Sequence, residues 1–326
     1  MIEATTENSS SLTSRPTVAV VVPSYNHAAF IELCLKSIIK QTFQPSFLLV
    51  IDDGSTDGSP QIIESVLKSC PFASELIARE NRGITATLNQ ALNQTESDYF
   101  AYLGSDDVWL EGFLSARVEL LQKRLAAVLA YGHAYFVDEQ NRVVDCTADW
   151  ADYKDGDAKS MLLTTIAPMS PTVLYRRKAL ARHGWNENTQ LEDFELYLKL
   201  SLEGDFAFDP QVLAAWRQHG TNTSRNQQMM LEEQLKALSM LGPHFGLSDS
   251  ELESLLQALR FSRAEDFLRV GDKKQALKLI VENLGAAERS KLLPIVKRLV
   301  LPYQLVSWRR QHKQQTATAK YGHLKI

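Results

Sequence analysis

An apolar run and an acidic turn follow each other directly in the stretch Phe47-Leu-Leu-Val-Ile-Asp-Asp-Gly-Ser-Thr-Asp57. The first five residues are apolar without interruption, which is typical of a strand buried on both faces of a parallel sheet. Apolar residues then recur at helical spacing from Ile62 to Leu67, so a helix is predicted after the turn. This stretch is therefore one strand–turn–helix unit, the building block of an α/β fold.

The same unit recurs on both sides of this stretch. The apolar run 17–22 ends in Pro23-Ser-Tyr-Asn-His27, and the run 99–103 ends in Gly104-Ser-Asp-Asp107, with a shorter strand predicted at 75–78. Helices are predicted between these strands, which favours an α/β/α sandwich with a mostly parallel sheet. The polar clusters then share the carboxyl edge of the sheet, where ligands bind in open α/β sheets.

The pattern changes beyond Ala127. Strands are predicted at 127–137, 172–175 and 212–216, and an amphipathic helix at 192–202. From residue 226 the sequence reads as entirely helical, and residues 264–276 resemble one helical hairpin of the tetratricopeptide type. The predicted organisation is a disordered polar leader over 1–15, a main domain over 16–225, and a helical C-terminal region with a basic amphipathic tail over 226–326.

Composition limits the classes of protein that the chain can belong to. The 326 residues carry a net charge of −4, which argues against nucleic acid as a partner. Three dispersed cysteines form no CxxC pair, and this fits a reducing compartment. Because the sequence contains no run resembling a signal peptide or a membrane span, we expect a cytoplasmic location.

Two acidic pairs lie at the predicted sheet edge, and each has two interpretations. Asp52-Asp53 forms either an ordinary turn, with Asp57 capping the next helix, or a carboxylate that accepts hydrogen bonds from a base or ribose. Asp106-Asp107 provides either a helix cap or ligands for Mg²⁺ or Mn²⁺, which bind carboxylates together with substrate phosphates. A second acidic pair at one edge favours the metal interpretation.

Five motifs follow one another along roughly residues 16–225. They are Val20–Asn26, Ser37–Phe43, Val50–Asp57, Glu80–Ile84 with Asn89 beyond it, and Leu103–Trp109. In this order they resemble the motifs of the family 2 glycosyltransferases. The resemblance implies the family's GT-A fold, with a mixed and mostly parallel sheet. It also implies inverting transfer of a sugar from a nucleotide-diphosphate donor.

The resemblance implies which residues bind the nucleotide. Pro23, Tyr25 and Asn26 would line the pocket, and Asp53 would hydrogen-bond a uracil-type base, so a UDP-type donor is favoured. Asp106 would lie near the ribose. Arg82, in the turn after the third strand, is a candidate phosphate contact.

The resemblance also implies a metal site. Asp107 would hold the divalent metal, Mn²⁺ or Mg²⁺, on the diphosphate. Many members carry another Asp where Gly104 stands, which puts that ligand in doubt. In Trp216-Arg-Gln-His219, Arg217 or His219 would contact the diphosphate, and His219 is a candidate metal ligand.

The segment Leu191-Glu-Asp193 looks like the family's catalytic Glu-Asp element. An acceptor hydroxyl is a poor nucleophile, so a positioned carboxylate must take its proton, and Asp193 is the predicted catalytic base. The alternative is that Glu192 and Asp193 only favour the first turn of a helix.

The C-terminal tail contains no Asp or Glu after residue 290. It is either a helix packed on the protein or an interfacial helix that docks on an anionic membrane surface. Membrane docking at the inner face would suit a lipid-linked acceptor in bacterial surface-polysaccharide assembly; a glycan acceptor is the other expectation. The basic residues are Lys291, Lys297, Arg298, Arg309, Arg310, Lys313, Lys320 and Lys325.

Two other classes of protein share part of this pattern. Receiver domains also carry Asp-Asp after a strand, but they need one phosphoacceptor within roughly 120 residues, whereas here acidic sites continue to Asp193. A transferase fold that has lost activity and only binds a nucleotide or glycan is the second. The presence of Asp53, Asp107 and Asp193 argues against it.

Overall fold

The structure is a computed structural model of the chain, and it describes residues 15–286 and 289–324. The predicted polar leader therefore lies outside the described residues, apart from Arg15. Among the helices of the described part, none is both long enough and apolar enough to cross a bilayer.

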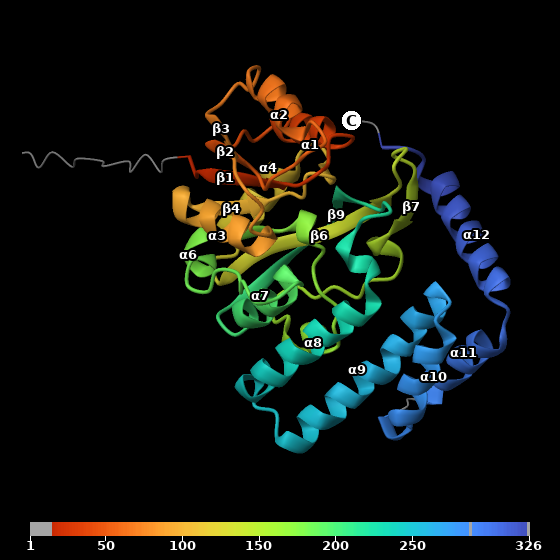
Figure 1. Cartoon of the computed structure of the whole chain (residues 1–326). Helices are drawn as coiled ribbons and strands as arrows, with labels where there is room; N and C mark the ends of the chain where they lie inside the picture. The colour runs from red at the N-terminus through yellow and green to blue at the C-terminus, as the bar shows by residue number, and fades with distance from the viewer. Residues whose placement is uncertain (1–14, 287–288, 325–326) are drawn as a thin grey trace, which may run out of the picture.

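One mixed sheet forms the centre of the molecule, with strand order β3-β2-β1-β4-β8-β6-β9-β5 and with β7 paired to β6 (Figure 1). Parallel pairing joins β1 to β2 and β4, β2 to β3, and β6 to β9, while the other pairs are antiparallel. This confirms the predicted mixed sheet. The strands are β1 Val18–Ser24, β2 Phe47–Asp52, β3 Ser74–Ala78, β4 Tyr99–Tyr102, β5 Val108–Trp109, β6 Ala127–Val137, β7 Val143–Cys146, β8 Leu174–Arg176 and β9 Asp205–Arg217.

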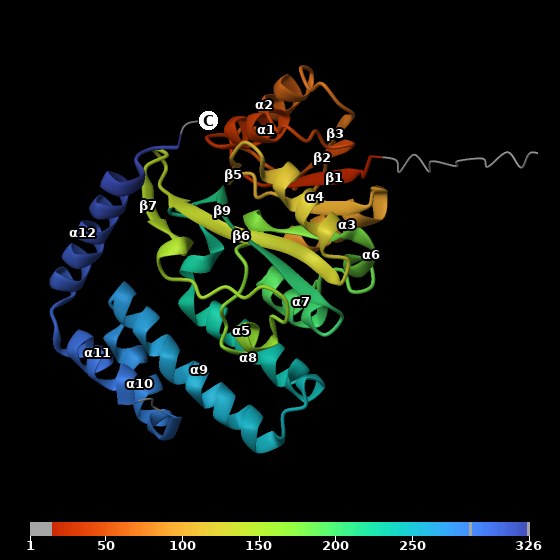
Figure 2. The ribbon, with the colours of Figure 1, turned by 180° about the vertical axis from the view of Figure 1, so that it is seen from behind.

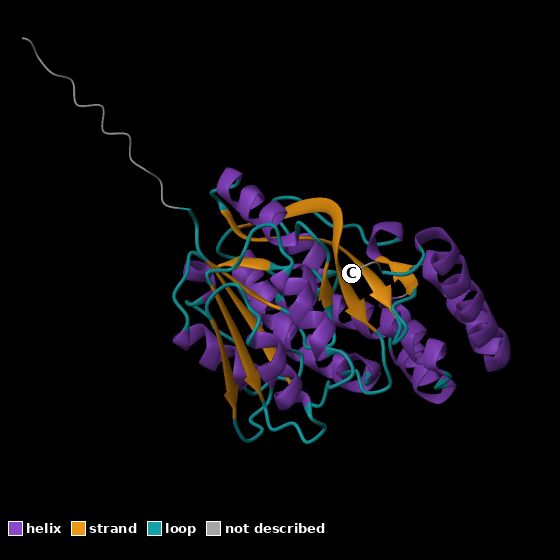
Figure 3. Ribbon diagram, turned by 90° about the horizontal axis from the view of Figure 1, so that it is seen from above, coloured by secondary structure: helices purple, strands orange, loops and turns teal. Residues whose placement is uncertain are grey.

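Helices cover both faces of the sheet (Figure 3). Residues of α1, α2 and α4 pack in one core cluster with one face, and residues of α3, α5, α6 and α7 pack in another cluster with the opposite face. The helices are α1 Ile31–Ile39, α2 Ser59–Leu67, α3 Ile84–Gln94, α4 Phe113–Lys123, α5 Lys159–Leu163, α6 Arg177–Leu180, α7 Glu192–Ser201, α8 Gln227–Leu241, α9 Asp249–Val270, α10 Lys273–Glu282, α11 Arg289–Val300 and α12 Tyr303–Tyr321.

The uninterrupted apolar strands are buried on both faces, as their sequence predicts. In β1, Ala19 and Val21 point into one core cluster, while Val18, Val20 and Val22 point into the other. Successive side chains of a strand alternate between faces, so a strand covered by helices on both sides needs apolar residues at every position. The sandwich therefore follows from the same residues that identified the strands.

The C-terminal helices share a core with the sheet. Leu231 and Leu238 of α8 and Phe261 of α9 belong to the cluster that contains Leu49 and Phe100. Helices α9 and α10 form the predicted hairpin, which turns at Gly271 with a φ of 90°. The described C-terminal helices α8, α9 and α10 thus extend the core of the sheet domain.

Helix α12 runs along one edge of the molecule from α11 back to β7 (Figures 1 and 2). Pro302 separates α11 from α12, whereas Pro294 lies inside α11 without ending it. Near the end of α12 the Thr318 hydroxyl donates to the Val143 carbonyl over 2.7 Å. The tail therefore packs on the protein through the last turns of α12.

Candidate active site

Two carboxylates of the acidic turn after β2, those of Asp52 and Asp57, bond to the neighbouring backbone. Asp52 accepts hydrogen bonds from the Ser55 N–H at 2.9 Å and the Ser55 hydroxyl at 2.7 Å, which closes the turn. Asp57 accepts from the Ala28 N–H at 2.8 Å and from the Ser59 N–H at 3.0 Å. These two carboxylates therefore shape the loops after β1 and β2, as the turn interpretation predicts.

Asp53 joins this turn to the loop that follows β3. Its carboxylate accepts the Arg82 N–H at 3.0 Å and the Gly83 N–H at 2.8 Å, and it pairs with Arg79 Nη1 at 2.7 Å. The side chain is buried, whereas the Arg82 side chain is exposed. Asp53 therefore holds the 79–83 loop in place at the sheet edge, and its contact with a base remains a prediction.

The loop after β1 lies beside the Asp53 turn. Asn26 adopts a φ of 54°, its side-chain oxygen accepts the Thr56 N–H at 2.9 Å, and its own N–H donates to the Ser55 hydroxyl at 2.8 Å. Pro23 is half-buried and Tyr25 is half-exposed. The structure thus brings the predicted nucleotide residues Pro23, Tyr25, Asn26 and Asp53 to one edge of the sheet.

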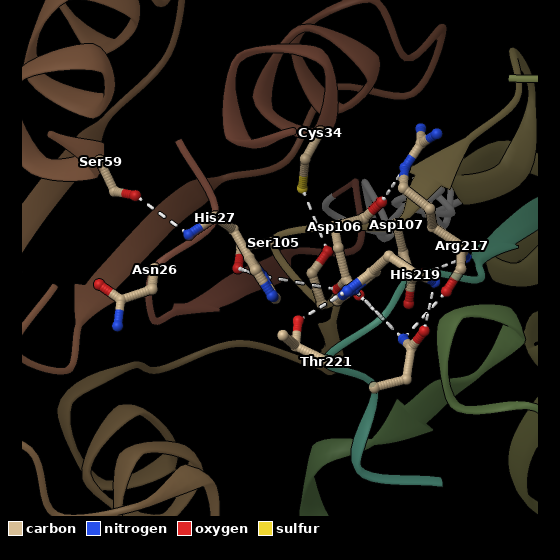
Figure 4. Close-up of polar contacts among 12 residues, drawn as sticks. Asn26, His27, Cys34, Ser59, Ser105, Asp106, Asp107, Arg217, His219 and Thr221 are labelled. Carbon is tan, nitrogen blue, oxygen red and sulfur yellow. Dashed lines mark hydrogen bonds and ion pairs between the residues drawn. The ribbon is translucent and has the colours of Figure 1, made fainter. Parts of the chain in front are cut away.

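A cluster of two histidines and one aspartate lies at the same edge (Figure 4). Asp106 Oδ2 is 2.8 Å from His219 Nε2, and Asp106 Oδ1 is 3.8 Å from His27 Nδ1. One ligand atom from each of the three residues lies within 4.8 Å of the others. Burial lowers the pKa of His27, which favours the neutral imidazole that a metal requires.

This cluster fits a divalent cation. Carboxylate oxygen together with imidazole nitrogen is a donor set suited to first-row divalent metals such as Mn²⁺. Gly104 leaves room for the carboxylates, because a Cβ at this position would lie 3.0 Å from an oxygen of Asp106 and 3.0 Å from an oxygen of Asp107. His27, in the loop after β1, was not predicted as a site residue. Its position directly after Asn26, at the carboxyl edge of the sheet, could have identified it.

Asp107 is not one of the three residues of this cluster. Its side chain is buried, and its Oδ1 accepts the backbone N–H of Arg217 at 2.9 Å. Burial, and then the neighbouring charge of Asp106, raise the pKa of Asp107 well above its usual range. Of the two predicted metal ligands, His219 contacts the carboxylate of Asp106, while Asp107 Oδ1 is bonded to the backbone of Arg217; metal binding by Asp107 and His219 remains a prediction.

Arg217, the candidate diphosphate contact, is bonded to the backbone of the acidic turn. The residue is only 1% exposed, with Nε donating to the Asp106 carbonyl and Nη1 to the Asp138 carbonyl, both at 2.8 Å. The guanidinium lies over the Phe30 ring, 5.0 Å from its centroid. With two of its nitrogens donating to protein carbonyls, Arg217 fixes the Asp106–Asp107 turn, and its contact with a diphosphate remains a prediction.

The predicted catalytic element begins α7. Burial raises the pKa of Asp193 well above its usual range, and the adjacent charge of Glu192 raises it further. The Tyr102 hydroxyl donates to Glu192 Oε1 over 3.4 Å. Because Tyr102 ends β4, just before the turn that carries Asp106, α7 begins close to the acidic turn.

Comparison with known proteins identifies the family. The model of glycosyl transferase family 2 matches residues 19–184, more than half of the chain. Curated relatives include the chondroitin synthase of Escherichia coli, 25% identical over 66% of this chain and 31% of its own length. A teichuronic acid biosynthesis glycosyltransferase, TuaG of Bacillus subtilis, is assigned only putatively and is 30% identical over 38% of this chain and 50% of its own. The chain thus spans half or less of the length of these two relatives.

Solved structures show the same fold. The S. aureus protein TarS 1-349 in complex with UDP-GlcNAc matches with a TM-score of 0.60 at 18% identity, over 95% of this chain and 93% of its own. Mannosyltransferase PcManGT from Pyrobaculum calidifontis, in complex with GDP-Man and Mn²⁺, matches with a TM-score of 0.59 at 19% identity, over 94% and 87%. Because the family model matches more than half of the sequence, and the fold agrees with it, the chain belongs to glycosyl transferase family 2.

Proposed function

We propose that the protein transfers a sugar, with inversion, from a nucleotide-diphosphate donor to a hydroxyl of a glycan or lipid-linked acceptor in bacterial surface-polysaccharide assembly. One observation carries the proposal: the turn that follows β4 holds Asp106 against His219, and Tyr102, the last residue of β4, donates to Glu192, the neighbour of Asp193. Support comes from relatives whose names refer to chondroitin and teichuronic acid. It also comes from a structural neighbour that holds UDP-GlcNAc.

The donor nucleotide is proposed to bind across the loops after β1, β2 and β3. The exposed ring of Tyr25 offers a stacking surface for a base, and Pro23 and Asn26 shape the loop that carries it. Asp53 would face the base, for which we favour the uracil type, while fixing the backbone of Arg82. The exposed Arg82 side chain is then free to approach a phosphate.

For the metal we propose Asp106 and His219 as ligands, with His27 within reach of the same ion. Asp107 remains the sequence-based candidate, but its bond to the Arg217 N–H favours a role in holding the turn. A bound divalent cation would neutralise charge on the departing nucleoside diphosphate. The contact between Asp106 and His219 orients the carboxylate for that role.

For the chemical step we propose Asp193 as the base. Its raised pKa makes the ionised carboxylate a stronger proton acceptor than an exposed aspartate. The acceptor hydroxyl gives its proton to Asp193 as its oxygen attacks the anomeric carbon, and the bond to the diphosphate breaks on the opposite side. One displacement of this kind inverts the anomeric configuration.

The test is a thermal-shift screen of UDP-, GDP-, CMP- and dTDP-sugars with Mn²⁺, followed by measurement of nucleotide release with the best donor. We expect one nucleotide class to raise the melting temperature only when Mn²⁺ is present. The Asp193→Asn variant should keep that shift and lose nucleotide release. Nucleotide release at the wild-type rate by Asp193→Asn would contradict the proposal. So would a wild type that binds a donor and releases no nucleotide, which is the behaviour of an inactive binding protein.

We further propose that the tail docks on the anionic inner surface of the cell membrane. Val300 of α11 and Trp308 of α12 are exposed, by 77% and 58%. Described residues 289–324 carry basic but no acidic side chains, so lipid headgroups complement their charge. Co-sedimentation with vesicles containing phosphatidylglycerol at low salt should fall when Arg309 and Arg310 are changed to Gln. Equal binding by this variant, or no binding by the wild type, contradicts docking by the tail.

A further inference from the structure

Three aromatic rings form a row on the sheet beside the candidate active site. The Phe136 ring on β6 lies 5.2 Å from Trp216 on β9 and 6.2 Å from Trp150, measured between ring centroids. Trp150 is 54% exposed, and the other two rings are partly exposed. The row lies outside the three core clusters that the described residues form. We call Trp150, Phe136 and Trp216 the aromatic row.

The inner end of the aromatic row joins the active-site edge through the backbone. Trp216 is the residue before Arg217, whose N–H binds Asp107, and it comes three residues before His219. Because a chain spans no more than about 3.3 Å per residue, the Cα atoms of Trp216 and His219 lie at most about 10 Å apart. A molecule lying on the row can therefore extend towards the centre where transfer is proposed.

The outer end of the aromatic row is held by α12. Trp150 follows the short helical turn Thr147–Asp149, and Asp149 pairs with Lys320 at 2.7 Å and accepts the Tyr321 hydroxyl at 2.8 Å. On its other side the turn is anchored by the Thr147 hydroxyl, which accepts the Ala134 N–H at 2.9 Å. The exposed indole thus stands on a fixed support, which lowers the entropy cost of binding.

The charge around the aromatic row indicates the class of ligand. Residues 138–157 carry seven carboxylates and two basic side chains, and three of those carboxylates pair with Arg124, Lys313 and Lys320 from other elements. Such a surface offers hydrogen-bond acceptors and does not favour an anionic lipid or a phosphate. Aromatic faces carry negative charge density, to which the polarised C–H groups of a pyranose ring are attracted.

We propose that the aromatic row is the acceptor subsite and binds the neutral pyranose rings of a glycan. This inference rests on the proposed function, because it assigns the row to the acceptor of that reaction. Trp216 would lie under the sugar nearest the transfer centre and Trp150 under a sugar further along the chain. Carboxylates flanking the row would accept hydrogen bonds from the sugar hydroxyls.

The test is ligand-observed NMR titration of the full chain with tetrasaccharides of glucose, galactose, mannose and N-acetylglucosamine as probes. We expect the wild type to bind at least one probe, and Trp150→Ala to raise its Kd at least tenfold. Trp150→Phe should restore most of the affinity. Trp308→Ala is the matched control, since this tryptophan is equally exposed but lies on α12; it should leave the Kd within twofold.

Two outcomes overturn the proposal: a wild type that binds none of the four probes, or a Trp150→Ala variant that binds them as the wild type does. The donor thermal shift with Mn²⁺ is measured on the same variants and should be unchanged in Trp150→Ala. If no donor shifts the melting temperature of any of these proteins, but glycan binding still depends on Trp150, the proposed sugar transfer is contradicted and the proposed glycan site is supported.

Discussion

As the proposed base, Asp193 must be ionised before it can take a proton, so its raised pKa should affect the pH dependence of the rate. Below that pKa the carboxyl is protonated and inactive, so kcat should rise with pH through a value above the usual aspartate range. The neighbouring charge of Glu192 contributes to the shift. We therefore expect Glu192→Gln to move the acid limb of the kcat profile to lower pH. An acid limb in the same place in both proteins contradicts this electrostatic coupling.

The Asp106–His219 contact predicts which variants lose the metal. Asp106→Asn and His219→Ala should each raise the Kd for Mn²⁺ at least tenfold, because each would remove one of the proposed ligands. The measurement is the Mn²⁺ dependence of the melting temperature, since an ion that binds only the folded state stabilises it. Asp152→Asn, at an exposed aspartate that pairs with Lys154, should behave as the wild type. Unchanged Mn²⁺ affinity in both active-site variants contradicts this assignment.

The individual residues show how far the sequence could predict the site. Asp53, Asp106 and Asn26 were placed correctly at one edge, because each follows a strand whose end the apolar pattern marks. The direction of a side chain depends on tertiary contacts that no local pattern encodes. For that reason the turn of Asp107 toward the Arg217 N–H and the approach of His27 to Asp106 were not predictable.

At the scale of the elements, the end of β9 fixes the acidic turn through Arg217. Arg217→Met should leave the carbonyls of Asp106 and Asp138 buried without their donors. Each such loss costs about 1–3 kcal/mol, so the free energy of unfolding should fall by a few kcal/mol in urea titrations. Arg82→Ala, at an exposed position, should change it by less than about 0.5 kcal/mol. Equal stability of the two variants contradicts the positioning role.

The elements differ in how well their sequence identified them. The bounds of β1, β2 and β6 were predicted closely, because a continuous apolar run that ends in turn residues indicates a buried strand. The strands β5 and β7 have only two and four residues and were missed, since so short a segment has no measurable period. Strand β9 begins at Asp205, seven residues earlier than predicted, because pairing with the long β6 extends it.

At the scale of the whole molecule, one core unites the sheet with the C-terminal helices. Leu238 of α8 is fully buried in the cluster that also contains Phe100 and Leu198. Leu238→Ala should therefore destabilise the whole chain by about 2–5 kcal/mol. In calorimetry both proteins should unfold in a single transition. A variant in which only a separate, smaller transition moves to lower temperature contradicts the shared core.

We propose that one sheet edge combines a metal-dependent donor site with Asp193 as the base. The most direct measurement is nucleoside diphosphate release from the donor that gives the Mn²⁺-dependent thermal shift, comparing wild type with Mn²⁺, wild type with EDTA, and Asp193→Asn with Mn²⁺. We predict release only in the first case, with the variant slower by about 10²- to 10⁴-fold. Release at the same rate with EDTA, or at the same rate in Asp193→Asn, would contradict the account.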